Sequence, residues 1–191
     1  MVKGVARRAL AGALLMLAAG VSVEARQPRD PFGRGTVGVE FGFSPMVESW
    51  NLNGRRESLV EGTAALWGAV RDGLGIGVEF CHLRVFQQTP GAFVQGFSPL
   101  VRWRFAGRET WNAFVETGPG ISWSDLPTPP NGTKFNYLYQ ASAGMMRRIG
   151  SNGHAVFGAR FLHLSNNHRE GRDHNPDLEM IGPFAALAFS F

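Results

Sequence analysis

The chain has 191 residues, of which 25 are glycine, 12% are aromatic and one is cysteine, and its formal net charge is +4. The length suits a single domain, the lone cysteine excludes an intramolecular disulfide, and the charge forms no concentrated basic stripe of the kind that binds nucleic acid. Abundant glycine and aromatic residues, with no helix-period segment beyond the first 25 residues, favour β structure.

Residues 1–25 have the pattern of a secretory signal peptide. Three basic residues precede an apolar run over 9–21, and Val23-Glu24-Ala25 fits the small-x-small cleavage site. The run is too short for a membrane-spanning helix; the alternative is a buried N-terminal helix. Cleavage removes three bases and one acid and leaves a net charge of 16 − 14 = +2. Residues 26–34 are a polar lead-in, so the predicted domain spans 35–191.

Eight segments of the remaining chain alternate between apolar and polar or small residues, which is the period of a β-strand. In one of them Leu74, Ile76 and Val78 alternate with Gly75 and Gly77. The second segment has the least clear alternation. The eight predicted strands are 35–43, 58–69, 74–86, 93–105, 111–123, 133–146, 153–165 and 179–191.

The connections between these segments alternate in length. Short glycine-containing turns at 71–73, 106–109 and 150–152 predict hairpins. The other connections are mostly longer, and the predicted loops are 44–57, 87–92, 124–132 and 166–178. Short turns at one end and long loops at the other are typical of an outer-membrane barrel. The predicted fold is therefore all-β, an eight-stranded antiparallel up-and-down transmembrane β-barrel.

A soluble β-sandwich or a lipocalin-like barrel is the competing fold, in which the apolar face points inward. Leu187, Phe189 and the terminal Phe191 share one face of the last segment, which resembles the C-terminal assembly signal of outer-membrane barrels and favours the membrane fold. The opposite faces of the strands carry charges that would point into the barrel and pair there, filling it as a core with no open pore. These predicted inward residues are Glu40, Glu79, Glu116, Arg102, Arg104 and Arg160.

Three polar side chains near the last long loop could form a nucleophilic site. His163 and Ser165 are two apart on a predicted strand and so share one face. Glu179 opens the final strand, so a hairpin would bring it beside them. A serine hydroxyl needs a base within hydrogen-bond reach, and the base needs an acceptor that fixes its tautomer. Alternatively, these are polar residues at a strand end and a solvated loop acid.

The barrel layout predicts where this group lies. With both termini on the periplasmic side, the seventh strand rises to His163 and Ser165, and the eighth begins at Glu179 and descends. All three share parity with lipid-facing residues of their strands, so they lie on the outer wall at the level of the outer leaflet. Polar groups that face lipid are costly unless they are used. The predicted substrate is therefore a lipid ester.

The segment His163-Leu164-Ser165-Asn166, followed by Asn175-Pro176 and Glu179, resembles the active-site signature of the outer-membrane lipid A 3-O-deacylases. The resemblance implies Ser165 as nucleophile, His163 as general base and Glu179 as its orienting acid. It also implies that Asn166 contributes to the oxyanion hole; its alternative is a simple turn residue. The family usually continues with Ala and Gly after the Asn, whereas this chain continues with Asn167-His168-Arg169.

The loops near this segment carry several bases that could contact lipid A phosphates. Solvated loop charges are the alternative for all of them. The candidates are Arg169 and Arg172, with His168 and His174, and Arg55 and Arg56 from the first long loop.

The sequence predicts a surface esterase that removes an acyl chain, the 3-O-linked hydroxyacyl chain by the resemblance, from lipid A or lipopolysaccharide. It predicts no metal or other cofactor, no nucleic-acid partner, and a possible homodimer. Two alternatives belong to other classes. One is a non-enzymatic small barrel acting in adhesion or membrane integrity, and the other is a lipid A acyltransferase with a phospholipid donor.

Overall fold

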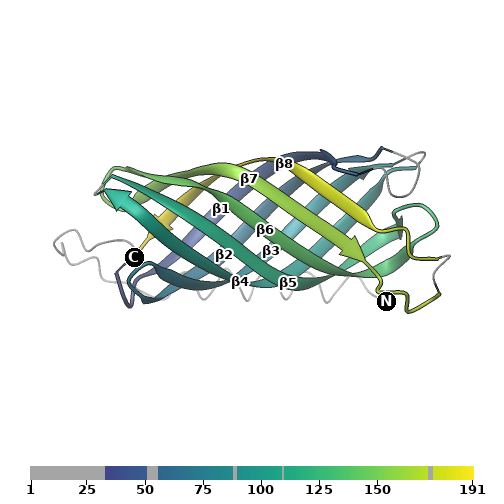
Figure 1. Ribbon diagram of the computed structural model, residues 1–191, viewed down its shortest axis with the longest axis horizontal. Helices are drawn as coiled ribbons and strands as arrows, with labels where there is room; N and C mark the ends of the chain where they lie inside the picture. Colours follow the sequence, from purple (N-terminus) through teal and green to yellow (C-terminus); the bar gives the residue numbers. More distant parts are fainter. Residues whose placement is uncertain (1–32, 51–55, 88–89, 109, 172–173) are drawn as a thin grey trace, which may run out of the picture.

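The computed structural model describes residues 33–50, 56–87, 90–108, 110–171 and 174–191. The chain forms one closed antiparallel barrel, in which each strand pairs with its neighbours in sequence and β1 pairs with β8; Figure 1 shows the strands tilted against the long axis. The strands are β1 Val37–Glu48, β2 Ser58–Arg71, β3 Leu74–Phe86, β4 Ala92–Arg108, β5 Trp111–Thr128, β6 Thr133–Ile149, β7 Gly153–Ser165 and β8 Leu178–Ser190. The predicted fold is confirmed.

Two strands continue well into the predicted long loops, and β4 continues three residues into the predicted turn 106–109. β1 was expected to end at 43 and β5 at 123, but they extend to Glu48 and Thr128, so the predicted loops 44–57 and 124–132 are each five residues too long. The cause in β1 is that alternation continues beyond a proline: Ser44 and Met46 remain buried on either side of Pro45. Proline is tolerated here because it interrupts the ladder only locally.

The interruption lies at the seam that closes the barrel. The pairing of β1 with β8 is continuous to Phe43 and resumes at Val47. Across this gap the Ser44 hydroxyl donates a hydrogen bond to the Pro183 carbonyl of β8, at 2.7 Å. A side chain thus supplies a contact at a point where the backbone of Pro45 lacks a donor.

The outer wall is apolar along most of its height. Exposed large apolar side chains occur on every strand, and they include Phe41, Phe43, Leu66, Ile76, Phe80, Phe97, Trp103, Val115, Trp123, Phe157, Ile181, Leu187 and Phe189. Such a belt would be unfavourable in water and is what a bilayer requires of a spanning barrel. Among the described residues, no helix has the length and apolar character needed to cross a membrane.

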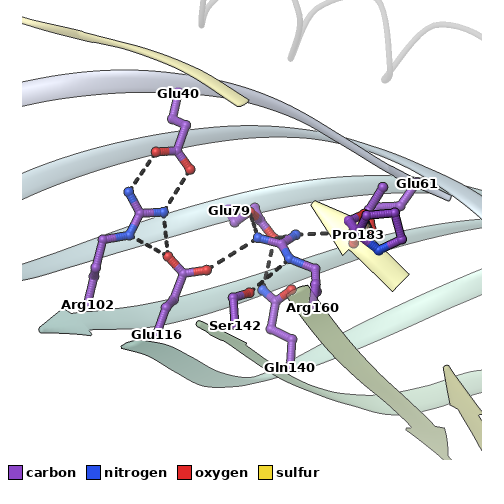
Figure 2. A network of polar contacts seen from close by, with 10 residues as sticks. Glu40, Glu61, Glu79, Arg102, Glu116, Gln140, Ser142, Arg160 and Pro183 are labelled. Atoms are coloured by element: carbon purple, nitrogen blue, oxygen red, sulfur yellow. Dashed lines mark hydrogen bonds and ion pairs between the residues drawn. The ribbon is translucent and has the colours of Figure 1, made fainter. Parts of the chain in front are cut away.

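The middle of the barrel is filled by an ionic layer, drawn in Figure 2. Arg102 pairs with Glu40 (2.6 Å) and Glu116, and Arg160 pairs with Glu79 (3.2 Å) and Glu61 (3.1 Å). Glu116 also contacts Arg160, at 3.3 Å, and thereby joins the two groups. Pairing of inward charges was predicted, but Glu61 was missed because β2 has an unclear alternation. Arg104, also predicted to point inward, is only partly buried.

The interior is less polar than the sequence predicted, because apolar clusters lie above and below the ionic layer. One packs at the end with the long loops and consists of Met46, Leu59, Cys81, Leu83, Val85, Val94, Leu138, Leu162, Leu164, Leu178 and Met180. The other consists of Phe114, Met146, Val156, Phe184 and Ala186. The barrel therefore has a packed core along its length, in agreement with the expected filled interior.

The ends of the barrel differ as expected. The turns after β2, β4 and β6 are short, and the C-terminus lies at their end of the barrel, as Figure 1 shows. The connections after β1, β3, β5 and β7 lie at the other end. The predicted signal peptide and most of the predicted lead-in, residues 1–32, lie outside the described residues.

Candidate active site

His163 and Glu179 lie directly opposite each other on β7 and β8, next to the loop that joins these strands. The Nδ1 atom of His163 is 3.5 Å from a carboxylate oxygen of Glu179, and the two side chains keep 29% and 20% of their exposure. Cross-strand partners share a face, so both point to the outer wall. A carboxylate at this position can accept the Nδ1 proton and leave Nε2 available as a base.

Ser165 follows on the same face of β7 and ends the strand. Its hydroxyl donates a hydrogen bond to Oδ1 of Asn175, at 3.1 Å, and accepts one from the backbone N–H of Asn167, at 3.1 Å. Among the described residues no hydrogen bond joins Ser165 to His163. The structure thus places the predicted base and acid side by side. The hydroxyl of the predicted nucleophile bonds instead to Asn175 and Asn167.

A tight turn follows the serine at once. Asn167 and His168 both have positive φ, 54° and 59°, and the N–H of Arg169 donates to the Asn166 carbonyl at 3.3 Å. Two left-handed residues inside an i to i+3 hydrogen bond are the arrangement of a type I′ turn. Asparagine tolerates this conformation well. This chain has Asn167-His168 where the family usually has Ala and Gly. The left-handed turn explains the asparagine at the first of these positions, whereas a histidine with positive φ at the second is less usual.

Asn166 lies inside this turn, with 2% of its surface exposed. Its backbone N–H donates to Asn175 Oδ1 at 2.8 Å, and its side-chain nitrogen donates to the His174 carbonyl at 2.6 Å. Both groups therefore hold the loop together in this state. An oxyanion role for Asn166, which the resemblance implies, would need the second hydrogen of its amide or a rearrangement of these contacts.

Asn175 is a site residue to which the sequence assigned no role. Its Oδ1 accepts from both Ser165 and Asn166, and its Nδ2 donates to Asp177 at 2.8 Å. It connects the two ends of the β7–β8 loop across the candidate nucleophile. The Asn175-Pro176 dipeptide was noticed only as part of the family signature, and nothing in the local sequence could reveal that its side chain returns to Ser165.

The outward-facing site residues rest on a rigid inner layer. Leu162, Leu164, Leu178 and Met180 alternate with them on β7 and β8 and have no measurable exposure. They belong to the apolar cluster at this end of the barrel. Because a strand sends successive side chains to opposite faces, close packing inside fixes the positions of His163, Ser165 and Glu179 outside.

Aromatic residues of β6 flank the site on one side. Tyr137 lies opposite Ser165, and Tyr139 lies opposite His163. The Arg169 guanidinium lies 5.6 Å from the Phe135 ring and donates a long hydrogen bond, 3.4 Å, to the Tyr137 hydroxyl. An apolar wall with a cation at its loop end suits a molecule that has an acyl chain and an anionic head.

The other flank comes from the end of β1. Ser49 donates its backbone N–H to the Glu179 carbonyl at 2.8 Å, and its hydroxyl donates to the same oxygen at 3.1 Å. The exposed Trp50 packs edge-on against Phe161 of β7, with ring centroids 6.2 Å apart. These contacts fix the start of β8 and hence the backbone of Glu179.

Four of the six residues predicted to contact lipid A phosphates lie in the part of the chain that the structure describes. Arg169 and Arg56 are exposed, as are His168 and His174, whereas Arg55 and Arg172 lie outside the described residues. Of the four described, only Arg169 has a contact that ties it to the wall beside Ser165. Within the described ranges, no three His, Cys, Asp or Glu side chains lie close enough to hold a metal ion.

The sequence matches the model of one protein family, described as lipid A 3-O-deacylase (PagL), over residues 38–187. No curated protein matches the chain.

Among solved structures, the crystal structure of the outer-membrane enzyme PagL is similar, with a TM-score of 0.62 and 16% identity over 78% of this chain and 97% of that one. Neisserial surface protein A is also similar, with a TM-score of 0.59 and 8% identity over 82% and 96%. The N-terminal barrel of Pseudomonas aeruginosa OprF has a TM-score of 0.51 and 12% identity over 83% and 99%. At these identities the likeness shows the fold, that of an outer-membrane barrel.

Proposed function

Because the chain belongs to the lipid A 3-O-deacylase family, an outer-membrane family of carboxylic ester hydrolases, we propose that it cleaves the 3-O-linked acyl chain of lipid A with Ser165, His163 and Glu179. The observation that carries this assignment is the cross-strand pair of His163 and Glu179, 3.5 Å apart on the outer wall, with Ser165 next on the same face. A lipid-facing acid and imidazole are costly unless they serve a function.

The proposed reaction begins when the Ser165 hydroxyl leaves Asn175 and turns toward His163. Residues two apart on a strand are about 7 Å apart at Cα, a span that an imidazole and a hydroxymethyl group can bridge. Nε2 of His163 takes the proton as Oγ attacks the ester carbonyl. The tetrahedral intermediate then expels the sugar 3-hydroxyl, which receives the proton from His163, and a water molecule hydrolyses the acyl-enzyme in the same way.

Glu179 stabilises the imidazolium that forms in both steps and keeps the ring in the required tautomer. A donor for the developing oxyanion is the backbone N–H of Asn167, which now donates to Ser165 Oγ and is released when Oγ turns. The Asn166 amide, implied by the family resemblance, is the second candidate. Asn175 holds the turn in which both donors lie.

We propose that the site faces the outer leaflet, where lipid A resides. The support is the layout of the barrel, with long loops at the end that carries His163 and Glu179 and short turns at the other. Arg169, held beside Tyr137, would then contact a phosphate of the substrate. Arg169→Gln should raise the KM for lipid A and leave kcat within about twofold, because it removes a binding contact distant from the reacting atoms.

The test measures fatty acid released from purified lipid A by detergent-refolded protein. Ser165→Ala and His163→Ala should each lower turnover by several orders of magnitude, Glu179→Ala somewhat less, and the double change of Ser165 and His163 little more than either alone. Ser124→Ala is the matched control, since this β5 serine is also partly exposed and its hydroxyl donates to the Lys134 carbonyl, away from the candidate triad. It should retain parental activity.

The alternatives give different products. Mass spectrometry of lipid A from cells with and without the protein should show loss of one hydroxyacyl group. Gain of a chain would identify an acyltransferase, and an unchanged lipid A would favour the non-enzymatic barrel. If Ser165→Ala folds and releases fatty acid at the parental rate, Ser165 is not the nucleophile and the assignment fails.

A further inference from the structure

A second group of polar side chains faces outward on β3 and β4, away from the candidate triad. His82 and Arg84 point to the outer wall of β3, and their partners on β4 are Gln95 and Phe93. In the closed strand order, β3 lies four strands from β7 in either direction, so this group is on the opposite side of the barrel. It lies toward the same end as the triad, because β3 and β7 run in the same direction.

The guanidinium of Arg84 is held in a fixed position by aromatic rings. It lies 4.2 Å from the ring centre of Phe93 and 6.0 Å from that of Phe86. His82 stacks on the same Phe93, with centroids 5.6 Å apart and an interplanar angle of 25°. Stacking on a ring face attracts the cation and fixes the plane of its donors.

Arg84 has no acidic partner among the described residues. One terminal nitrogen of Arg84 donates a hydrogen bond to the Gly91 carbonyl, at 3.2 Å. Asp125 of β5, two strands from Arg84, accepts the backbone N–H of Phe93 at 2.8 Å and forms no ion pair with Arg84. An arginine has five N–H donors, so most of the hydrogen-bonding capacity of Arg84 is not used by the described residues.

The surroundings of these donors are apolar. Phe80 and Phe97 lie on the same outer face, farther from the loops, and are half exposed. A cation on a lipid-facing wall is unfavourable unless it reaches the interface or meets an anion. The planar guanidinium fork matches a phosphate group, and a neighbouring imidazole can donate a further hydrogen bond. Acyl chains attached to that phosphate could lie along the two phenylalanine rings.

We propose that Arg84, together with His82, binds a phosphate group of a second lipid A molecule, which is not the one being cleaved. The choice of lipid A rests on the proposed function, since that function places this end of the barrel in the outer leaflet. The site retains one lipid on the wall opposite the triad and thereby anchors the barrel at a fixed depth. It takes no part in the hydrolysis.

Native mass spectrometry of the refolded barrel tests the site, with purified 3-O-deacylated lipid A as the probe. This probe needs no turnover, so the result can be interpreted even if the triad assignment fails. The parental protein should retain two lipid molecules. Arg84→Gln should bind the second at least about tenfold more weakly, the effect of losing one charged hydrogen-bonding group. Arg84→Lys, which keeps the charge without the fork, should be intermediate.

Arg71→Gln is the matched control, because this exposed arginine lies at the other end of the barrel; it should retain both lipids. Heat-modifiable migration on gels shows that each variant is folded, and fatty acid release by Arg84→Gln should stay within about twofold of the parent. Retention of the second lipid by folded Arg84→Gln would overturn the site. Equal retention of dephosphorylated lipid A would exclude a phosphate contact, and equal retention of phosphatidylglycerol would exclude lipid A as the ligand.

Discussion

Removal of the Arg160 guanidinium is the sharpest test of how the barrel interior is stabilised. In Arg160→Met the side chain keeps its apolar body but leaves three carboxylates without this partner. Glu116 retains Arg102 and Glu79 retains a hydrogen bond from Gln140, at 2.9 Å. Glu61 retains no ion pair among the described residues, so most of the cost should fall there.

The size of the effect follows from burial. Arg160 and its three acidic partners are all buried in the barrel, and breaking a buried pair by removing one partner costs about 3–5 kcal/mol. The contact of the guanidinium with the Phe184 ring, at 4.1 Å, is lost as well. We therefore expect the free energy of unfolding to fall by about 4 kcal/mol. Adding Glu61→Gln to Arg160→Met should restore roughly 0.5–3 kcal/mol, because it removes the unpaired charge.

Urea unfolding in detergent micelles, followed by tryptophan fluorescence, measures this change, and Arg147→Met is the control. Arg147 is exposed, and its guanidinium lies 5.1 Å from the Trp111 ring and forms no ion pair among the described residues, so its loss should cost less than about 1 kcal/mol. Equal stability of Arg160→Met and Arg147→Met would refute the argument that the ionic layer stabilises the fold. Failure of Glu61→Gln to restore any stability would refute the assignment of the cost to that carboxylate.

Three further outcomes are expected. Asn175→Ala should lower turnover by roughly 10–100-fold in a barrel that still shows heat-modifiable migration, because the turn holding Ser165 is loosened; unchanged release of fatty acid would exclude a positioning role. In intact cells a membrane-impermeant thiol reagent should label a cysteine placed at Asn131 but not one at Ser151. The reverse labelling would contradict the proposed orientation of the barrel in the membrane. Deletion of Phe191, whose backbone N–H donates to β1 at 2.8 Å, should reduce the yield of assembled protein more than its specific activity, and a proportional loss of both would contradict this.

Most of the strands could be predicted because they carry a local signal, whereas β2 has no clear alternation. Alternation along β3 and β7 fixed which residues face lipid, and glycine-containing turns fixed the boundaries at residues 74 and 153. The two largest errors in strand ends follow apparent breaks, at Pro45 in β1 and after Trp123 in β5. A proline ends a strand only where the neighbouring strand needs a backbone N–H donor at that position. The sequence of one strand does not contain that information.

The interior charges show the same limit. That Glu40, Glu79, Arg102 and Arg160 point inward and pair follows from facing once the barrel is closed, but which acid meets which base does not. Glu61 could not be assigned because alanine and glycine around it give β2 no clear apolar face. The register that brings it to Arg160 is determined by pairing with β1 and β3, which no local pattern specifies.

The candidate site depends on both kinds of information. That His163 and Ser165 share a face follows from their spacing of two, and the approach of Glu179 follows from one hairpin whose strands end where the sequence indicated. The contacts of Asn175 depend instead on the path of the β7–β8 loop, and the left-handed turn at Asn167 depends on the hydrogen bond that closes it. Loop geometry of this type is set by side chains that meet only after folding.

The inward face of β7 packs the core and the outward face carries the candidate site residues, which makes the site compatible with a stable barrel. Leu162 and Leu164 pack inward with no measurable exposure, and Arg160 anchors the same strand in the ionic layer. The alternate residues are therefore free to carry chemistry on the lipid side at little cost to packing. Changes at His163 should accordingly lower activity with small effects on stability, whereas changes at Leu162 should lower stability first. A strand whose two faces showed the same response would not be organised in this way.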